Sequence, residues 1–208
     1  MTNAMTFEAQ PLIDELDSVL SRAPAAWRGK TLRRVTDLFL VDAECYTDDQ
    51  VAVFDDVISH LIENIDRRML IELSNRLAQV KNAPIKVVGA LARHTDMLVA
   101  GPLLESSSVL TDADLVEIAD KDRRDPTLLS AIVARPRLSE TVTDVLIRRG
   151  PPAIARKILD NSEARISESS FARMVTSVEN DKELATAIAK REDLPVELRP
   201  WLDAALAQ

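Results

Sequence analysis

The two histidines of the chain, His60 and His94, are the side chains best suited to acid–base or phosphoryl-transfer chemistry near neutral pH. His60 lies in the stretch ISHLIENI, where helical spacing places it at the edge of an apolar face, as expected of a phosphoacceptor in a phosphorelay. Glu63 and Asn64 follow it, instead of the basic and small residues that usually accompany such a histidine. The pattern favours an ordinary helix residue, with a phosphorelay or regulatory role for His60 as an alternative.

His94 and Asp96 form the second candidate pair, for a metal site or for acid–base catalysis. A tetrahedral zinc site would need both histidines, Cys45 and a carboxylate to converge. The simpler interpretation is that Asp96 caps a following helix while His94 favours the end of the preceding one. We therefore predict no metal, no cofactor and no catalytic residue. Because Cys45 is the only cysteine, no intramolecular disulfide can form, and a reducing cytoplasm is the expected compartment.

The segment 27–34, WRGKTLRR, is the densest basic cluster and could contact phosphate, nucleic acid or acidic lipid. Its basic residues are Arg28, Lys30, Arg33 and Arg34, and Trp27 precedes them. The formal net charge of the whole chain is −8, which disfavours a general phosphate-backbone binder. Nucleic-acid binding through this segment therefore stays an alternative. No apolar run approaches the length of a membrane span, and the N-terminus lacks the pattern of a signal peptide, so we expect no membrane segment.

Apolar residues recur at helical spacing through almost the whole sequence, whereas no segment alternates as a half-buried strand would. Only four residues are glycine, which argues against a turn-rich β protein. In the N-terminal part, Thr47 and Gln50 form a capping box, the signature of a helix start. The helices expected there cover residues 12–23, 31–43, 47–65 and 67–80.

A repeat dominates the C-terminal part of the sequence. Four apolar anchors, Leu110, Leu138, Ile166 and Leu194, recur at a spacing of 28 residues. The next residue is a good helix N-cap in three copies, Thr111, Ser139 and Ser167, and a proline, Pro195, in the fourth. Each anchor is therefore expected to precede a helix. Its next apolar residues, such as Leu198, Trp201 and Leu202 in the last copy, would form the inward face.

A first helix precedes each anchor, so that each copy is a helix pair. Asp96, Asp125 and Asp181 are the expected N-caps of three of these first helices, and Pro102 is expected to kink or shorten one of them. Helix pairs at a fixed period bury their apolar stripes only by stacking on one another. The sequence thus predicts an all-α protein. An N-terminal helical bundle, residues 1–81, is followed by and packed continuously on a HEAT-like α-solenoid of about four helix pairs, residues 82–208.

The chain also resembles a known bacterial family, the domain of unknown function numbered 2336, over most of its length. The parts that carry the resemblance are the pair Phe54 and Asp55, the stretch from Asp96 to Leu104, and the run from Ala131 to Gly150. The resemblance implies an all-helical protein with HEAT-like repeats, common in alpha-proteobacteria, in a signalling or scaffolding role. It implies no catalytic residues, because none are established for the family.

These observations favour a cytoplasmic, non-enzymatic protein-interaction scaffold, in a bacterial signalling setting, that holds an unidentified protein or peptide on a concave surface. The contacts expected on the exposed faces of the second helices are Thr143, Asp144, Arg173 and Arg199. The final stretch PWLDAALAQ lacks a polar capping repeat, and exposed solenoid ends associate. We therefore expect a homodimer, formed through this end or through the N-terminal bundle.

Overall fold

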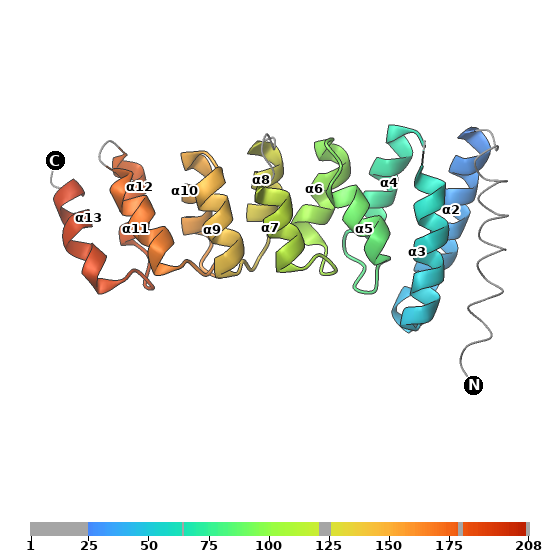
Figure 1. The fold of residues 1–208 in the computed structure, drawn as a ribbon, viewed down its shortest axis with the longest axis horizontal. Coiled ribbons are helices and arrows are strands. Elements are labelled where there is room, and N and C mark those ends of the chain that lie inside the picture. Colours follow the sequence, from blue (N-terminus) through green and yellow to red (C-terminus); the bar gives the residue numbers. More distant parts are fainter. Residues whose placement is uncertain (1–24, 64, 121–125, 179–180, 207–208) are drawn as a thin grey trace. The chain divides into compact units, whose positions relative to one another are not determined.

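The computed structural model describes residues 25–206 except residue 64, residues 121–125 and residues 179–180. The helix expected at 12–23 and the cap expected at Asp125 lie outside the described residues. Within the described ranges every regular element is a helix and no strand forms, so the all-α prediction is confirmed (Figure 1). The helices are α2 Ala25–Val41, η1 Ala43–Cys45, α3 Asp48–Ile62, α4 Arg67–Leu77, α5 Ile85–Ala92, α6 Met97–Ser106, α7 Asp112–Asp120, α8 Pro126–Val133, α9 Glu140–Arg149, α10 Pro152–Asp160, α11 Glu168–Thr176, α12 Lys182–Ala189, η3 Val196–Leu198 and α13 Arg199–Leu206.

The contacts between residues divide the chain into two compact units. The first holds the chain up to Val99 together with residues 107–109, and the second holds residues 100–106 and the chain from Leu110 onward. The boundary expected at residues 81 and 82 falls inside the first unit, where α4 packs on α5. The chain passes from one unit to the other within α6, which continues through Pro102. The expected shortening of this helix is therefore wrong.

The first unit is organised around α3, which packs on both α2 and α5. Phe39 of α2 and Ile58 of α3 are fully buried between these helices. Phe39 also forms a ring cluster with Tyr46 and Phe54, in which the ring centroids lie 5.2 to 5.9 Å apart. The start of α3 carries the predicted capping box, because Thr47 and Gln50 exchange hydrogen bonds between side chain and backbone.

A buried carboxylate fixes the start of α5. The N-cap of this helix is Pro84, which has no side-chain hydrogen bond to offer the first turn. Asp55 of α3, only 4% exposed, supplies it instead and accepts from the backbone N–H groups of Lys86 at 2.8 Å and Val87 at 2.9 Å. The negative charge also suits the positive pole of the helix. Asp55 therefore joins α3 to α5 by capping one helix from another.

Replacing Asp55 by alanine should lower the free energy of unfolding by about 2 kcal/mol, because one buried and one partly buried N–H group lose their acceptor. The matched control is Asp56→Ala, which removes the exposed ion pair with Lys86 and should cost less than about 1 kcal/mol. The two variants can be compared by urea unfolding. Equal midpoints for Asp55→Ala and Asp56→Ala would contradict the capping role.

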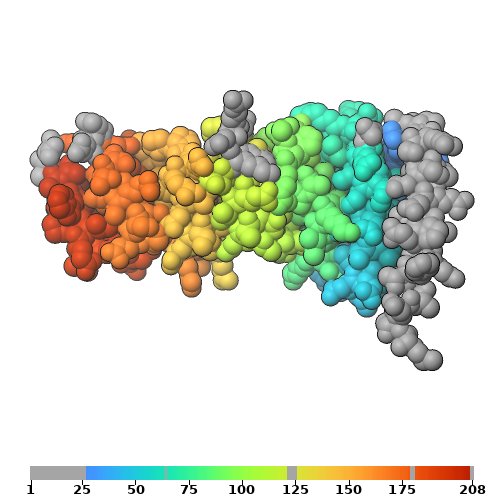
Figure 2. All heavy atoms as spheres, viewed as in Figure 1, coloured from blue at the N-terminus to red at the C-terminus, as the bar shows by residue number. Residues whose placement is uncertain are grey.

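The second unit is a succession of helix pairs in which each pair packs on the next. The second helices α7, α9 and α11 pack on one another in order, and so do the first helices α8, α10 and α12 (Figure 1). Side chains fill the spaces that the ribbon leaves between these helices (Figure 2). The four anchors at a spacing of 28 residues are all buried, with exposed fractions of 3 to 8%.

Local capping begins the helices of this unit as the sequence predicted. The hydroxyl of Ser139 accepts from the N–H of Val142, and that of Ser167 accepts from the N–H of Ser170. Thr111 and Asp114 cap each other reciprocally, and Asp181 accepts from the N–H of Leu184. The predicted caps at Thr111, Ser139, Ser167 and Asp181 are therefore confirmed.

A ladder of side-chain to backbone hydrogen bonds links the turns inside successive helix pairs. Arg135 donates to the carbonyl of Leu104 at 2.8 Å, and Asn161 donates to the carbonyl of Arg135 at 3.0 Å. Arg191 continues the ladder to the carbonyls of Asn161 at 2.7 Å and Ala164 at 2.8 Å. Burial lowers the pKa of the Arg135 guanidinium. Arg135 follows α8 and Arg191 follows α12, and the two arginines tie each pair to the preceding one.

Arg191→Ala should lower the free energy of unfolding by about 3 kcal/mol, because two carbonyls in the turns lose a charged donor in a largely buried place. Arg199→Ala serves as the control, since Arg199 is exposed and forms no ion pair with a described residue, and should cost less than about 0.5 kcal/mol. Thermal unfolding followed by circular dichroism measures both. An Arg191→Ala protein as stable as Arg199→Ala would show that the ladder contributes nothing.

Candidate functional site

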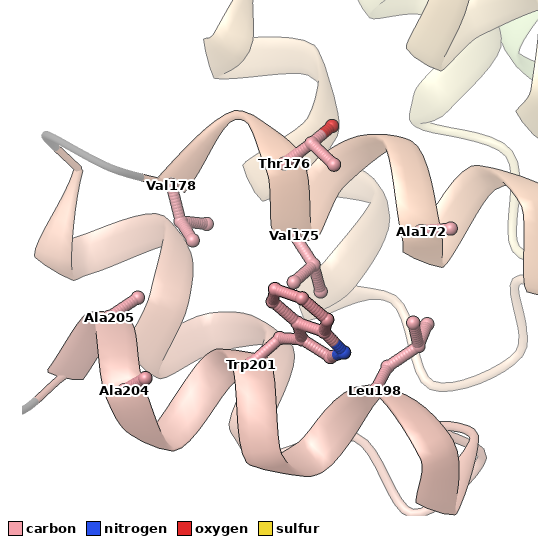
Figure 3. Close-up of a pocket in the computed structure, with 8 residues that line it drawn as sticks. All are labelled: Ala172, Val175, Thr176, Val178, Leu198, Trp201, Ala204 and Ala205. Atoms are coloured by element: carbon pink, nitrogen blue, oxygen red, sulfur yellow. The ribbon is translucent and has the colours of Figure 1, made fainter.

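An open apolar groove lies between α11 and α13 in the second unit (Figure 3). Its volume is about 500 Å³, within the range of about 300 to 1,000 Å³ that is usual for ligand sites. We call it the Trp201 groove, because the indole of Trp201 projects from α13 towards Val175 of α11 (Figure 3). The lining residues are Ala172, Val175, Thr176, Val178, Leu198, Trp201, Ala204 and Ala205.

The groove lies where the regular packing of second helices changes. α7 packs on α9 and α9 packs on α11, but α11 meets the last pair mainly through α12 and the short η3, while α13 packs on α12. Pro195 precedes η3, and Pro200 occupies the first turn of α13. A proline lacks an N–H donor and is tolerated before a helix and in its first turn, so the last second helix begins as η3 and continues directly as α13.

Trp201 is the most informative side chain of the groove, and sequence reasoning misplaced it. The apolar pattern assigned Leu198, Trp201 and Leu202 to the inward face, yet only Leu202 is buried. Trp201 is 72% exposed, whereas the next residue, Leu202, is 2% exposed. A large aromatic side chain held exposed beside an apolar groove is typical of a recognition surface. The two closely spaced prolines were the available signal in the sequence.

Three charged residues near the groove have no partner among the described residues. Glu168 lies four residues before Ala172, Arg173 lies three before Thr176, and Glu197 lies four before Trp201. Within α11, residues at these spacings share a helix face, which places Glu168 and Arg173 beside the lining. Glu197 lies in η3, next to the lining residue Leu198. All three are exposed, and none forms a side-chain hydrogen bond or an ion pair with another described residue. The border of the Trp201 groove thus carries available charges of both signs.

The four predicted partner contacts separate into two kinds. Arg173 and Arg199 are exposed, as expected. Thr143 is fully buried, and its hydroxyl donates to the carbonyls of Glu140 at 3.0 Å and Arg165 at 2.6 Å, so its expected exposure is wrong. The physical reason is that this face of α9 packs against the turn that leads into α11.

Asp144 links two second helices, α9 and α11, by hydrogen bonds. Its carboxylate accepts from the hydroxyls of Ser167 and Ser170, each at 2.6 Å, at the start of α11. Asp144 is only partly exposed, so the expectation of a freely exposed contact is corrected here as well. No signal in the sequence indicates this role, because it depends on which helix lies next to α9 in space.

The two histidines are engaged in local contacts of the helices. The Nδ1 of partly buried His60 lies 2.6 Å from the carbonyl of Asp56, one turn earlier in α3, and donates to it. The Nδ1 of His94 accepts from the backbone N–H of Asp96 at 3.0 Å. Asp96 in turn caps α6 by accepting from the N–H of Leu98, as predicted. Its ion pair with Arg67, followed by this backbone hydrogen bond, holds the pKa of Asp96 below its ordinary value.

The basic segment 27–34 lies on α2 in the first unit. Lys30 and Arg34 are exposed, Arg28 is partly buried, and Trp27 is 46% exposed. Arg33 forms a bidentate ion pair with Glu72 of α4, with contacts of 2.8 to 3.1 Å. This pair lowers the pKa of Glu72. The cluster therefore presents less positive charge than its sequence suggests.

Two searches of the described residues give negative findings. Among them no group of three or more His, Cys, Asp and Glu side chains could hold a metal ion. No helix in the described part of the chain combines the length and apolar character needed to cross a membrane.

The comparison with known proteins gives one match. A family described as "Uncharacterised protein conserved in bacteria (DUF2336)" matches residues 99–207, which is more than half of the chain. No curated protein and no solved structure matches the chain.

Asp144→Ala should lower the free energy of unfolding by about 1 to 2 kcal/mol, because two hydroxyl donors lose a charged acceptor. Arg173→Ala should leave stability within about 0.5 kcal/mol of the wild type, since Arg173 is exposed and its side chain has no partner among the described residues. Guanidinium unfolding of the two variants tests this distinction between a residue that links two helices and a surface residue. The reverse order of stabilities would refute it.

Proposed function

The chain belongs to the bacterial family DUF2336, and we propose that it is a non-enzymatic protein-interaction module. In this proposal the Trp201 groove receives apolar side chains of a partner protein, and the remaining helix pairs hold the groove in a fixed geometry. The setting is a bacterial signalling or scaffolding assembly in the cytoplasm.

The proposed architecture is a HEAT-like stack of short helix pairs. Its support is the spacing of 28 residues between buried anchors, the ordered packing of first on first and second on second helices, and the hydrogen-bond ladder from Leu104 to Arg191. Stacked pairs bind partners through extended surfaces made by corresponding helices. The ladder would keep such a surface rigid, which reduces the entropy that binding must overcome.

The observation that carries the proposal is the exposure of Trp201 beside the apolar groove. Tryptophan is enriched among the few residues that supply most of the binding free energy of protein interfaces. Aromatic residues make up only 3% of this chain, and Phe39 and Phe171 are fully buried. An exposed indole beside an apolar groove therefore fits the centre of an interface better than a place in the core. The small lining residues Ala172, Ala204 and Ala205 leave room for side chains from a partner.

The two alternative functions have weaker support. For a phosphorelay, the phosphoryl group would have to go to Nε2 of His60, because Nδ1 donates to the carbonyl of Asp56, and the side chain is only partly exposed. For nucleic-acid binding, Arg33 would have to exchange Glu72 for phosphate in a chain whose net charge is −8. A binding surface, by contrast, requires no rearrangement of the groove.

A photoreactive residue placed at Ala204, which is exposed and lines the groove, should form covalent adducts with a partner protein in the native host. The same residue at exposed Ala153 of α10 is the matched control and should give few adducts. Adding Trp201→Ala to the protein with the photoreactive residue at position 204 should remove most of the adducts, because the central contact is lost.

Adducts are identified by mass spectrometry after affinity purification. The proposal is refuted when position 204 gives no more adducts than position 153, or when the adducts at position 204 persist after Trp201→Ala.

A further inference from the structure

We infer that the occupant of the Trp201 groove is the same groove of a second copy, so that the chain forms a two-fold symmetric homodimer. The inference rests on the proposed function, because it names the partner of the same site. In a two-fold interface, residue i of one copy contacts residue j of the other, and j contacts i. The patch must therefore be complementary to itself in shape, in apolar character and in charge.

The apolar surface meets this requirement. Among the described residues of the second unit, the large hydrophobic side chains that stay exposed are Val196 and Trp201, each 72% exposed. Trp201 lines this groove, and Val196 lies in η3, two residues before the lining residue Leu198. Apolar exposure that is gathered in one place indicates an interface more strongly than the same residues scattered over the surface. A copy would cover both side chains at once.

The groove has room for a second indole. Its volume of about 500 Å³ opens between two helices, and the lining beside Trp201 consists of alanines and of medium-sized side chains such as Val175. With Trp201 of each copy placed over α11 of the other, each indole would contact Ala172 and Thr176 of its neighbour, the lining residues of α11 that are partly or fully exposed. Reciprocal burial of tryptophan at the centre of a small interface is consistent with a weak, concentration-dependent dimer.

The charges make the patch complementary to a copy. Arg173 lies in α11 and Glu197 lies in η3, directly before α13, and neither has an internal partner within the described structure. The two-fold apposition of α11 with α13 brings Arg173 of each copy to Glu197 of the other. Glu168, the third exposed charge, lies at the start of α11, the helix that also carries Arg173. A partner whose contact surface carries charges of a single sign would meet a like charge at Arg173 or at Glu197. A second copy presents an opposite charge to each of them.

The test is the molar mass of the purified full chain by analytical ultracentrifugation, from low to high micromolar concentration. The expected result is a monomer at low concentration and a dimer at high concentration. Trp201→Ala should weaken the dimer about 30-fold, the loss typical of a central tryptophan. Trp27→Ala, which changes the tryptophan of the first unit, should leave the dimer unchanged. Circular dichroism shows whether the Trp201→Ala protein is still folded. Trp201→Phe keeps an aromatic ring and should weaken the dimer less than Trp201→Ala does.

The charge arrangement has its own test. Arg173→Glu and Glu197→Arg should each weaken the dimer several-fold, and the double variant should restore it, because the opposite charges are exchanged. A monomer at every concentration, an undiminished dimer of Trp201→Ala, or a double variant weaker than either single variant would each overturn the inference. If the chain is a monomer while position 204 still cross-links to another protein in cells, the inference fails and the proposed function stands. If position 204 also gives no specific adduct, both fail.

Discussion

The second unit depends on one constraint, the shortness of its helices. From α7 to α13 the helices have 8 to 10 residues, and helices of this length are not stable on their own in water. Their apolar faces must be buried on neighbouring helices, so each pair stabilises the next. The anchors at a spacing of 28 residues meet this need, because each one is buried just before its second helix begins.

Short helices also have a large share of their backbone groups near helix ends, and the turns supply hydrogen-bond partners for some of these groups. Each helix end leaves carbonyls without an intrahelical partner. In the second unit, side chains from the following pair bind some of these carbonyls, as Arg135 does at Leu104 and Arg191 does at Asn161. The same contacts fix one pair relative to its neighbour. The ladder therefore supplies hydrogen-bond partners to backbone carbonyls and also fixes the positions of the helix pairs that form the Trp201 groove.

The sequence predicted what depends on neighbours along the chain and missed what depends on neighbours in space. Helices and caps follow from local chemistry, so Ser139 and Ser167 were placed correctly. Which face of a helix stays exposed depends on the helix that packs against it, so Thr143 was expected on the surface and Trp201 in the core. Asp55 shows the same limit, since its role is to cap a helix that begins some thirty residues later. The groove could not be predicted for this reason.

The central claim is that the Trp201 groove is open in the free chain, and the accessibility of its indole tests this most directly. Trp27→Phe leaves Trp201 as the only tryptophan, because the chain has two. At high dilution, acrylamide should quench its fluorescence almost as efficiently as that of a free tryptophan derivative, in accord with the 72% exposure of the side chain. A blue-shifted emission that resists quenching at every dilution would mean that the indole is buried within its own chain, and would contradict the account.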